Sequence, residues 1–210
     1  MPELDELRRK VDELASREEI RDVLYRYTRY IDRLDAEGVK QGYHPDADDI
    51  HWGTFIGNAH AFADYMVGEL RAVKYLIHEV TNPLVELDGE RAFVESRYTS
   101  RVRIDFEGAE EGQWVESIAH GRYLDIFERR AGQWKIAHRR IVQDGGRTSI
   151  VNDLGHYRPE AVGGQIPDDP VYKRFGIVDI APPPLEGVKG RFDGLREFGK
   201  RAAAAQRAGS

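Results

Sequence analysis

The N-terminal part of the chain repeats apolar residues at the spacing of an amphipathic helix. Over residues 3–35, apolar side chains recur every three or four positions, which places them on one face of a helix. Ser16 and Glu19 have the spacing of a capping box, so we expect the helix to restart there after a short break. The apolar stripe consists of Leu4, Leu7, Val11 and Leu14, followed by Ile20, Val23, Leu24, Tyr27, Ile31 and Leu34.

The next segment contains helix breakers and a further helix. Gly38, Gly42 and Pro45 interrupt the apolar pattern, and residues 43–53 (YHPDADDIHWG) predict a short helix that leads into an irregular or extended segment. Residues 59–77 again show one apolar stripe at helical spacing. The pattern therefore predicts three helices before the first strand.

After Pro83 the hydrophobic period changes from that of a helix to that of a strand. Residues 84–87 form a short predicted strand, and Asp88-Gly89 is a strong signal for a hairpin turn. Along residues 90–106, small or apolar side chains alternate with glutamate, threonine and arginine, so each kind occupies one face of a strand. Further strands are predicted over residues 113–128 and 133–143.

Helices followed by an antiparallel meander predict an α+β fold, in which the helices pack on one face of a curved sheet. We assign residues 1–144 to this domain and residues 145–210 to a C-terminal extension that is not an independent domain. Residues 145–190 are rich in Gly, Pro and Asp, so we expect an irregular arm that wraps around the domain or a neighbouring subunit. Residues 195–210 predict a short terminal helix.

The composition narrows the choice of partners and compartments. The 210 residues carry a net charge of -6, which argues against nucleic acid or an anionic membrane surface as a partner. The chain has no cysteine, so disulfides, thiolate nucleophiles and cysteine metal ligands are excluded, and a cytoplasmic protein is favoured. No run of about 18 apolar residues predicts a membrane span, and the charged N-terminus does not resemble a signal peptide.

An aspartate and a histidine are candidates for acid–base chemistry. Asp32 follows the apolar Ile31, and helix geometry puts it at the edge of the buried face, where a carboxylate is either solvated or paired. His78 lies at the expected end of a helix, where the helix dipole alone explains a histidine. If the two side chains meet in a pocket, Asp32 would hold one ring nitrogen of His78 and raise the basicity of the other. Such a pair is a general base that needs no metal or cofactor.

The other histidines depend on which way their side chains point. His44 and His51 lie seven residues apart but match no compact metal motif, so no metal site is predicted. His120 and His138 lie on predicted strands, where each has an even chance of facing a pocket.

Tyrosines and arginines complete the candidate chemistry. Tyr27, Tyr98 and Tyr123 are expected to line a pocket, where a buried phenol can polarise a substrate oxygen. Arg139 and Arg140 are adjacent on a predicted strand, so only one of them can face inward. The sequence has no glycine-rich nucleotide motif, no esterase elbow and no HExxH zinc motif, so those enzyme classes have no support.

Four segments follow one another along the chain: YIDRLD, YHPDADDIHW, IHEVTNPLVEL and RYLDIFERRAGQWKIAHRR. Together, and in this order, they resemble the SnoaL-like branch of the NTF2-like superfamily, whose fold is an α+β cone. The resemblance covers about residues 10–144. Dehydratases and dehydrochlorinases of this superfamily use an Asp–His dyad for proton abstraction and elimination without a cofactor. The resemblance implies that Asp32 and His78 form this dyad. It also implies that Tyr27 and Arg139 are catalytic residues.

The expected activity is that of a lyase that eliminates water from a small hydroxylated aromatic or polycyclic substrate in aromatic catabolism, without cofactor or metal. Two alternatives stay open. One is a carbon–carbon lyase that releases formaldehyde from a lignin-derived diaryl compound, and the other is a non-catalytic module that binds a small molecule. We expect no nucleic-acid or membrane partner, and a homo-oligomer that is a trimer or a dimer. Substrate-binding side chains are predicted at Tyr98, Tyr123, His120 and Trp52.

Overall fold

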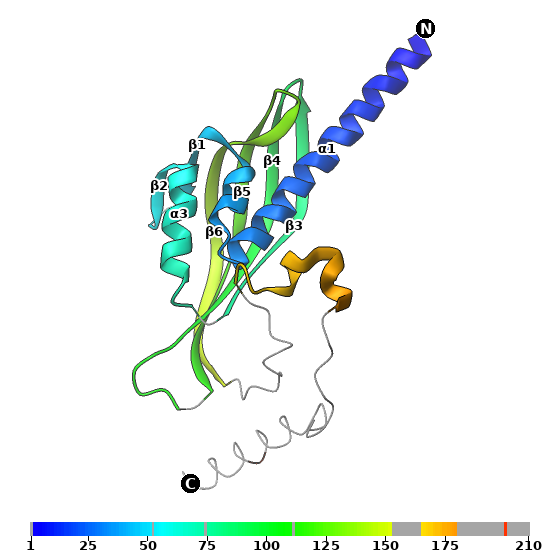
Figure 1. Cartoon of the computed structure of the whole chain (residues 1–210). Coiled ribbons are helices and arrows are strands. Elements are labelled where there is room, and N and C mark those ends of the chain that lie inside the picture. Colours follow the sequence, from blue (N-terminus) through cyan, green and yellow to red (C-terminus); the bar gives the residue numbers. More distant parts are fainter. Residues whose placement is uncertain are drawn as a thin grey trace. The chain divides into compact units, whose positions relative to one another are not determined.

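The computed structural model describes residues 2–51, 53–73, 75–110, 112–152 and 165–179, together with Lys200 (Figure 1). The predicted substrate contact of Trp52, and all but one residue of the helix predicted over 195–210, lie outside the described residues. The described elements are α1 (Pro2–Asp32), α2 (Ala36–Gln41), β1 (Tyr43–His51), β2 (Phe55–Asn58), α3 (Ala59–Leu70), β3 (Tyr75–Asp88), β4 (Arg91–Ile104), β5 (Gln113–Arg130), β6 (Gln133–Asn152) and η2 (Pro170–Asp179).

The chain divides into two compact units. One unit consists of residues 1–104 and 116–148, and the other of residues 105–115 and 149–210. In the second unit, η2 is a 3₁₀ segment interrupted at Arg174, whose φ of 49° is not helical. That the C-terminal part is an extension without a core of its own stays a prediction.

Helix α1 is continuous over 31 residues, so the predicted break near Ser16 is wrong. The Ser16 side chain is buried, and its hydroxyl lies 3.5 Å from Nη1 of Arg129 on β5 instead of capping a helix start. The second half of α1 buries Ile20, Leu24 and Ile31 in the core. Among the helices of the described residues, none is long and apolar enough to cross a membrane.

The sheet has six strands in the order β2-β1-β6-β5-β4-β3 (Figure 1). Strands β3 and β4 form the hairpin predicted at Asp88-Gly89, with Asp88 opposite Arg91. Strands β5 and β6 are joined at Ala131 and Gly132, which both have positive φ, as the tightest hairpin turns require. These two hairpins confirm the predicted antiparallel meander.

The other edge of the sheet differs from the prediction. Residues 43–51, expected to begin with a short helix, form strand β1 instead, and the short helix α2 precedes them. Strand β1 pairs parallel to β6 and antiparallel to β2. Strand β6 is also longer than predicted, because it continues to Asn152 rather than ending near residue 143.

The third helix is shorter, and the strand after it longer, than the hydrophobic pattern predicts. Helix α3 ends at Leu70 rather than at residue 77, and β3 begins at Tyr75. The segment from Tyr75 onward is rich in aromatic and β-branched residues, which favour strands. Its backbone pairs with β4, where His78 lies opposite Ser100. His78 is therefore a strand residue and not a helix-end residue.

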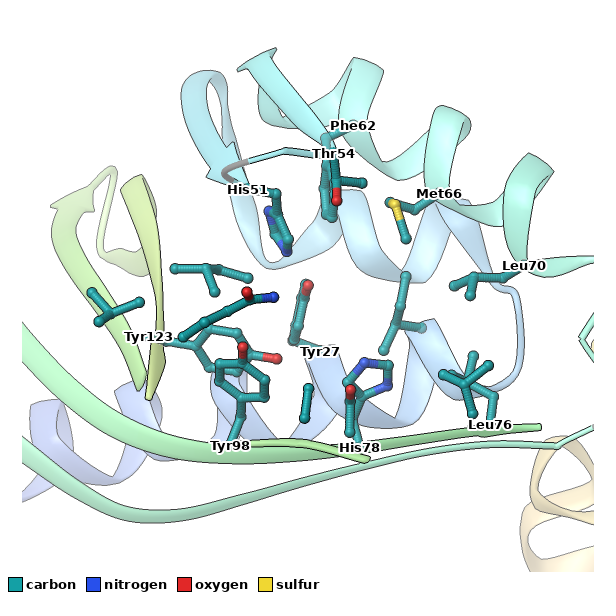
Figure 2. A pocket seen from close by; sticks show the side chains of 17 residues that line it. Tyr27, His51, Thr54, Phe62, Met66, Leu70, Leu76, His78, Tyr98 and Tyr123 are labelled. Carbon is teal, nitrogen blue, oxygen red and sulfur yellow. The ribbon is translucent and has the colours of Figure 1, made fainter. Parts of the chain in front are cut away.

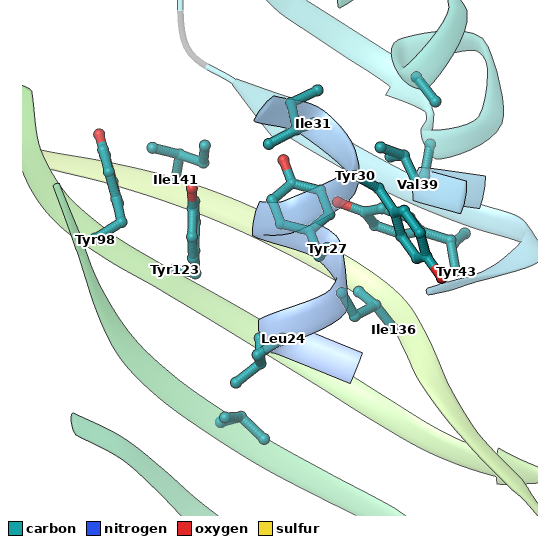
Figure 3. Close-up of a cluster of buried hydrophobic side chains, with 14 of the residues drawn as sticks. Leu24, Tyr27, Tyr30, Ile31, Val39, Tyr43, Tyr98, Tyr123, Ile136 and Ile141 are labelled. Carbon is teal, nitrogen blue, oxygen red and sulfur yellow. The ribbon is translucent and has the colours of Figure 1, made fainter. Parts of the chain in front are cut away.

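The prediction of an α+β fold with helices on one face of a curved sheet is confirmed. In Figure 1, α1, α2 and α3 lie on one side of the sheet. Figure 3 shows the core between them, in which Tyr27 of α1 packs edge-on against Tyr43 of β1 and Tyr123 of β5. The ring centroids are 6.0 Å apart in both pairs. These aromatic contacts hold the second half of α1 against the sheet.

Candidate active site

A pocket with a volume of about 370 Å³ lies between the helices and the sheet (Figure 2). Most of its wall is apolar or aromatic, with Phe62 and Met66 from α3 and Leu76 from β3 among the lining residues. A pocket of this size and character suits a small organic molecule. The lining side chains that carry polar groups are Tyr27, His51, Thr54, His78, Tyr98, Ser100, Tyr123 and Gln143.

The structure brings Asp32 and His78 together at this pocket. Nδ1 of His78 lies 2.7 Å from Oδ1 of Asp32, and the backbone N–H of His78 donates to Oδ2 at 3.0 Å. Asp32 is the last residue of α1 and His78 lies on β3, so the end of a helix and a strand fix the pair from two sides. The side chains of Asp32 and His78 are only 11% and 16% exposed. With Nδ1 bound to the carboxylate, Nε2 is the ring nitrogen that can exchange a proton with a bound molecule.

A second histidine–aspartate pair, which the sequence analysis did not predict, also reaches the pocket. Nδ1 of His51 hydrogen-bonds Oδ1 of Asp49, and the hydroxyl of Tyr43 donates to Oδ2 of Asp49 at 2.7 Å. The His51 ring stacks on Phe62, with centroids 4.2 Å apart. Asp49 and His51 are two residues apart on β1, and residues at that spacing share one face of a strand. That spacing is the signal that could have found the pair, had residues 43–51 been interpreted as a strand.

Tyr27, Tyr98 and Tyr123 line the pocket. Tyr98 and Tyr123 stack with ring centroids 4.7 Å apart, and the hydroxyl of Tyr27 points into the cavity in Figure 2. Burial raises the pKa of Tyr27 and of Tyr123 above the ordinary value of 10.0, although the charge of Arg139 opposes this effect. The phenols are therefore neutral at physiological pH and can donate hydrogen bonds.

Comparison with known proteins identifies the family. Residues 12–140 match the SnoaL-like domain. The chain belongs to the SnoaL-like domain family. No curated protein sequence matches it significantly.

Solved structures similar to this SnoaL-like protein share its fold. Hexachlorocyclohexane dehydrochlorinase LinA-type3 from Novosphingobium barchaimii superimposes with a TM-score of 0.58 at 19% identity, covering 67% of this chain and 94% of that one. A candidate scytalone dehydratase from Novosphingobium aromaticivorans gives 0.53 at 18% identity, covering 74% and 95%. An NTF2-like protein with a cystatin-like fold from the same organism gives 0.52 at 23% identity, covering 68% and 91%. The predicted NTF2-like fold is thereby confirmed.

In this SnoaL-like domain Arg139 does not line the pocket. It is fully buried and binds Asp125 through two hydrogen bonds of 2.7 Å. Its guanidinium carbon lies 4.3 Å from the ring centroid of Tyr27 and 4.2 Å from that of Tyr123. Burial lowers the pKa of Arg139, but Asp125 together with Tyr43 and Tyr27 raises it by more, so this pKa lies above its ordinary value. The Tyr27 and Tyr123 rings that Arg139 contacts line the pocket, whereas Arg139 itself does not, so its position gives it no direct contact with a molecule in the pocket.

The position of His120 contradicts the expected substrate contact. Its neighbour Ala119 lines the pocket, so strand alternation turns His120 to the opposite face. There it is exposed, and its Nδ1 lies 3.1 Å from the hydroxyl of Thr99. His138 also lies outside the pocket lining and pairs with Asp48.

The two histidines considered as metal ligands bind different partners. Nε2 of His44 hydrogen-bonds the carbonyl oxygen of Glu128 at 2.9 Å, whereas His51 bonds Asp49. Within the described part of the chain, no group of three or more histidine, aspartate and glutamate side chains is arranged to hold a metal ion.

Proposed function

We propose that this SnoaL-like protein is a cofactor-independent lyase that eliminates water from a small hydroxylated aromatic or polycyclic substrate. The observation that carries the proposal is the 2.7 Å hydrogen bond between His78 and Asp32 at the wall of a largely apolar pocket. A histidine whose Nδ1 is held by a carboxylate can act as a general base through Nε2. The dehydrochlorinase and the candidate dehydratase that share the fold support elimination chemistry at such a site.

In the proposed first step, Nε2 of His78 removes a proton from a substrate carbon next to the leaving hydroxyl. Asp32 accepts the hydrogen bond from Nδ1 and stabilises the imidazolium that forms, and its second oxygen holds the backbone of His78 in place. Histidine is a weak base, so the carbon acid must be activated by a neighbouring carbonyl or an electron-poor ring. The substrate is therefore expected to carry an oxygen that becomes negatively charged during the reaction.

The pocket tyrosines are suited to stabilise that developing charge. Tyr27 and Tyr98 carry neutral phenols at the cavity wall, and a preorganised donor aimed at an oxyanion is worth several kcal/mol, about 2.7–4 for a single donor in one protease. Arg139 lies over the rings of Tyr27 and Tyr123, where its charge makes these two phenols stronger donors. Arg139 thus contributes by positioning and polarising the phenols rather than by touching the substrate.

The test compares two dyad variants with a matched pair outside the pocket. We expect His78→Ala and Asp32→Asn each to lower kcat by about 10²–10⁴-fold, the usual contribution of a positioned general base. His138→Ala and Asp48→Asn are the controls, because this exposed histidine–aspartate pair lies outside the pocket. Turnover of a panel of hydroxylated aromatic ketones would be followed by mass spectrometry, with formaldehyde trapped in the same assay.

The outcomes separate the proposal from its alternatives. Undiminished turnover in both dyad variants would show that the pair is not the base. Formaldehyde among the products would replace dehydration by carbon–carbon cleavage with the same base. Tight binding of the panel without any turnover would instead favour a non-catalytic binding module.

A further inference from the structure

The His51–Asp49 pair is built like the His78–Asp32 pair and faces the same pocket. In both, Nδ1 of the histidine binds an aspartate oxygen, and the histidine is part of the pocket lining. Figure 2 shows His51 and His78 on opposite sides of the cavity, with the Tyr27 hydroxyl between them. One pocket therefore holds two imidazoles whose Nε2 atoms can exchange protons with the same bound molecule.

Asp49 is the more deeply buried of the two aspartates. Its side chain has no exposed surface, whereas that of Asp32 is 11% exposed. A buried carboxylate is costly unless donors surround it, and here the Tyr43 hydroxyl and Nδ1 of His51 are those donors. The attraction between a carboxylate and an imidazolium is also stronger where solvent does not reach the pair. Of the two pairs, His51–Asp49 is thus the one whose carboxylate is fully enclosed by protein donors.

The His51 ring is held in a fixed orientation. Its face stacks on Phe62 at an interplanar angle of 21°, and its edge is bound to Asp49. Asp49 is in turn held by Tyr43, whose ring packs against Tyr27. Held in this way, His51 lines the cavity.

We propose that His51 is the general acid that protonates the leaving group, with Asp49 and Tyr43 as positioning residues. The inference rests on the proposed function, in which His78 is the base. His78 takes the proton from carbon, the C–H electron pair forms the new C=C bond, and the C–O bond breaks. The leaving oxygen takes its electron pair from that bond and a proton from Nε2 of His51, so the products are the alkene and water. Proton exchange with solvent then returns His78 to its neutral form and His51 to its charged form.

The test uses two substrates that differ only in the leaving group. One is a β-hydroxy-β-phenyl ketone, which loses hydroxide unless an acid protonates it, and the other is the nitrophenyl ether of the same ketone, whose leaving group needs no proton. Both give the same unsaturated ketone. We expect His51→Gln to lower kcat for the hydroxy ketone by about 10²–10⁴-fold and to leave the nitrophenyl ether nearly unchanged. Asp49→Asn should show the same leaving-group dependence with a smaller loss.

His78→Gln and His138→Gln are the comparison variants. Loss of the base should slow both ketones, because both lose the same proton. His138 pairs with Asp48 outside the pocket, so its replacement should slow neither. If His78→Gln slows neither ketone, or if the wild-type protein converts neither, the proposed function fails whatever His51 does.

Two results would overturn the role of His51 while leaving the proposed function intact. One is an equal loss for both ketones in His51→Gln, and the other is no loss for either. Because His51→Gln could unfold, the wild-type protein supplies an independent test with a series of substituted phenyl ethers. General-acid catalysis predicts rates that vary little with the acidity of the departing phenol, and a steep dependence would contradict the proposal.

Discussion

At the scale of single residues, the shape of the pocket wall depends on Gly121 of β5. A Cβ added there would lie 2.1 Å from the carbonyl oxygen of Val142 and 2.6 Å from Cε1 of Tyr98. Both distances are far below van der Waals contact, and one of the two atoms belongs to the backbone. The absence of a side chain at Gly121 thus lets the Tyr98 ring lie against the sheet, where it stacks on Tyr123.

Gly121→Ala is therefore expected to destabilise the protein by about 1–3 kcal/mol, the usual cost of overpacking a core. It should also displace Tyr98 and weaken binding of an aromatic ligand. Gly68→Ala is the control, since Gly68 lies on helix α3 with no atom within 4 Å of its added Cβ. That change should be neutral or stabilising by up to about 1 kcal/mol. Denaturant unfolding measures the stability of both variants. If Gly121→Ala were as stable as the wild-type protein, the sheet would accommodate the added Cβ at no cost and the expectation would be wrong.

The residues of the candidate site were predictable only in part. Asp32 and His78 were paired from their places in the hydrophobic pattern and from a family resemblance, although His78 was expected at a helix end. Asp49 and His51 were missed because Pro45 and the acidic residues around Asp49 have the composition of a loop. Side-chain direction is harder still, since it depends on the register of neighbouring strands.

At the scale of elements, pairing with neighbouring strands determines the secondary structure of segments whose sequence signal is weak. Strand β1 is flanked by β2 and β6, which satisfy its backbone on both edges in spite of its polar composition. Residues 75–81 carry apolar side chains that fit both a helix and a strand, and pairing with β4 selects the strand. By contrast, β4 and the Asp88-Gly89 turn were predictable because period and turn residues agree there.

Arg129 of β5 connects helix α1 with the β3–β4 hairpin. Its guanidinium lies 2.8 Å from Asp12 of α1 and 2.6 Å from Glu90, and it also packs over the ring of Trp134. The hydrogen bonds with Arg129 lower the pKa of Asp12 below its ordinary 3.8 and that of Glu90 below its ordinary 4.5. A lowered carboxyl pKa in the folded state means that the contact stabilises the protein above the ordinary values, and that this stabilisation is lost as the pH falls through the lowered ones.

Arg129→Ala should consequently lower the melting temperature more at neutral pH than in acid below the lowered pKa values of Asp12 and Glu90. In acid both carboxyls are protonated in the wild-type protein too, so the variant has less to lose. Arg8→Ala serves as the control, because the Arg8 side chain is 72% exposed and its ion pair with Asp5 is long, at 3.6 Å. Calorimetric melting at several pH values makes the comparison. An equal difference at all pH values would mean that packing on Trp134, and not the ion pairs, is what Arg129 contributes.

At the scale of the whole molecule, the first half of α1 carries an apolar stripe that the rest of its unit leaves exposed. Leu4, Leu7, Val11 and Leu14 are 51%, 57%, 56% and 67% exposed. Their spacing of three, four and three residues is that of the contact positions in a coiled coil. In Figure 1 this half of the helix extends past the end of the sheet, whereas the second half lies against it.

The homo-oligomer expected from the sequence is therefore proposed to use this stripe, with a second copy of the chain as its partner. In a parallel pairing, Glu3 of one copy would lie beside Arg8 of the next, which adds an opposite-charge contact to the apolar seam. We expect the wild-type protein to sediment as a dimer or trimer and the double variant Leu7→Lys/Val11→Lys to approach the monomer mass of 24.0 kDa.

Glu6→Lys/Glu13→Lys is the matched control, since it makes at least as large a change in charge on the same half of α1 but leaves the stripe intact. Sedimentation equilibrium measures the masses, and circular dichroism verifies that each variant keeps its helix content. A wild-type protein that sediments at 24.0 kDa would refute self-association, whereas an oligomer that survives Leu7→Lys/Val11→Lys would place the interface elsewhere. The stripe is a sensitive test because these side chains contribute little to their own unit: lysine at an exposed helix position has a high helix propensity and removes no core contact.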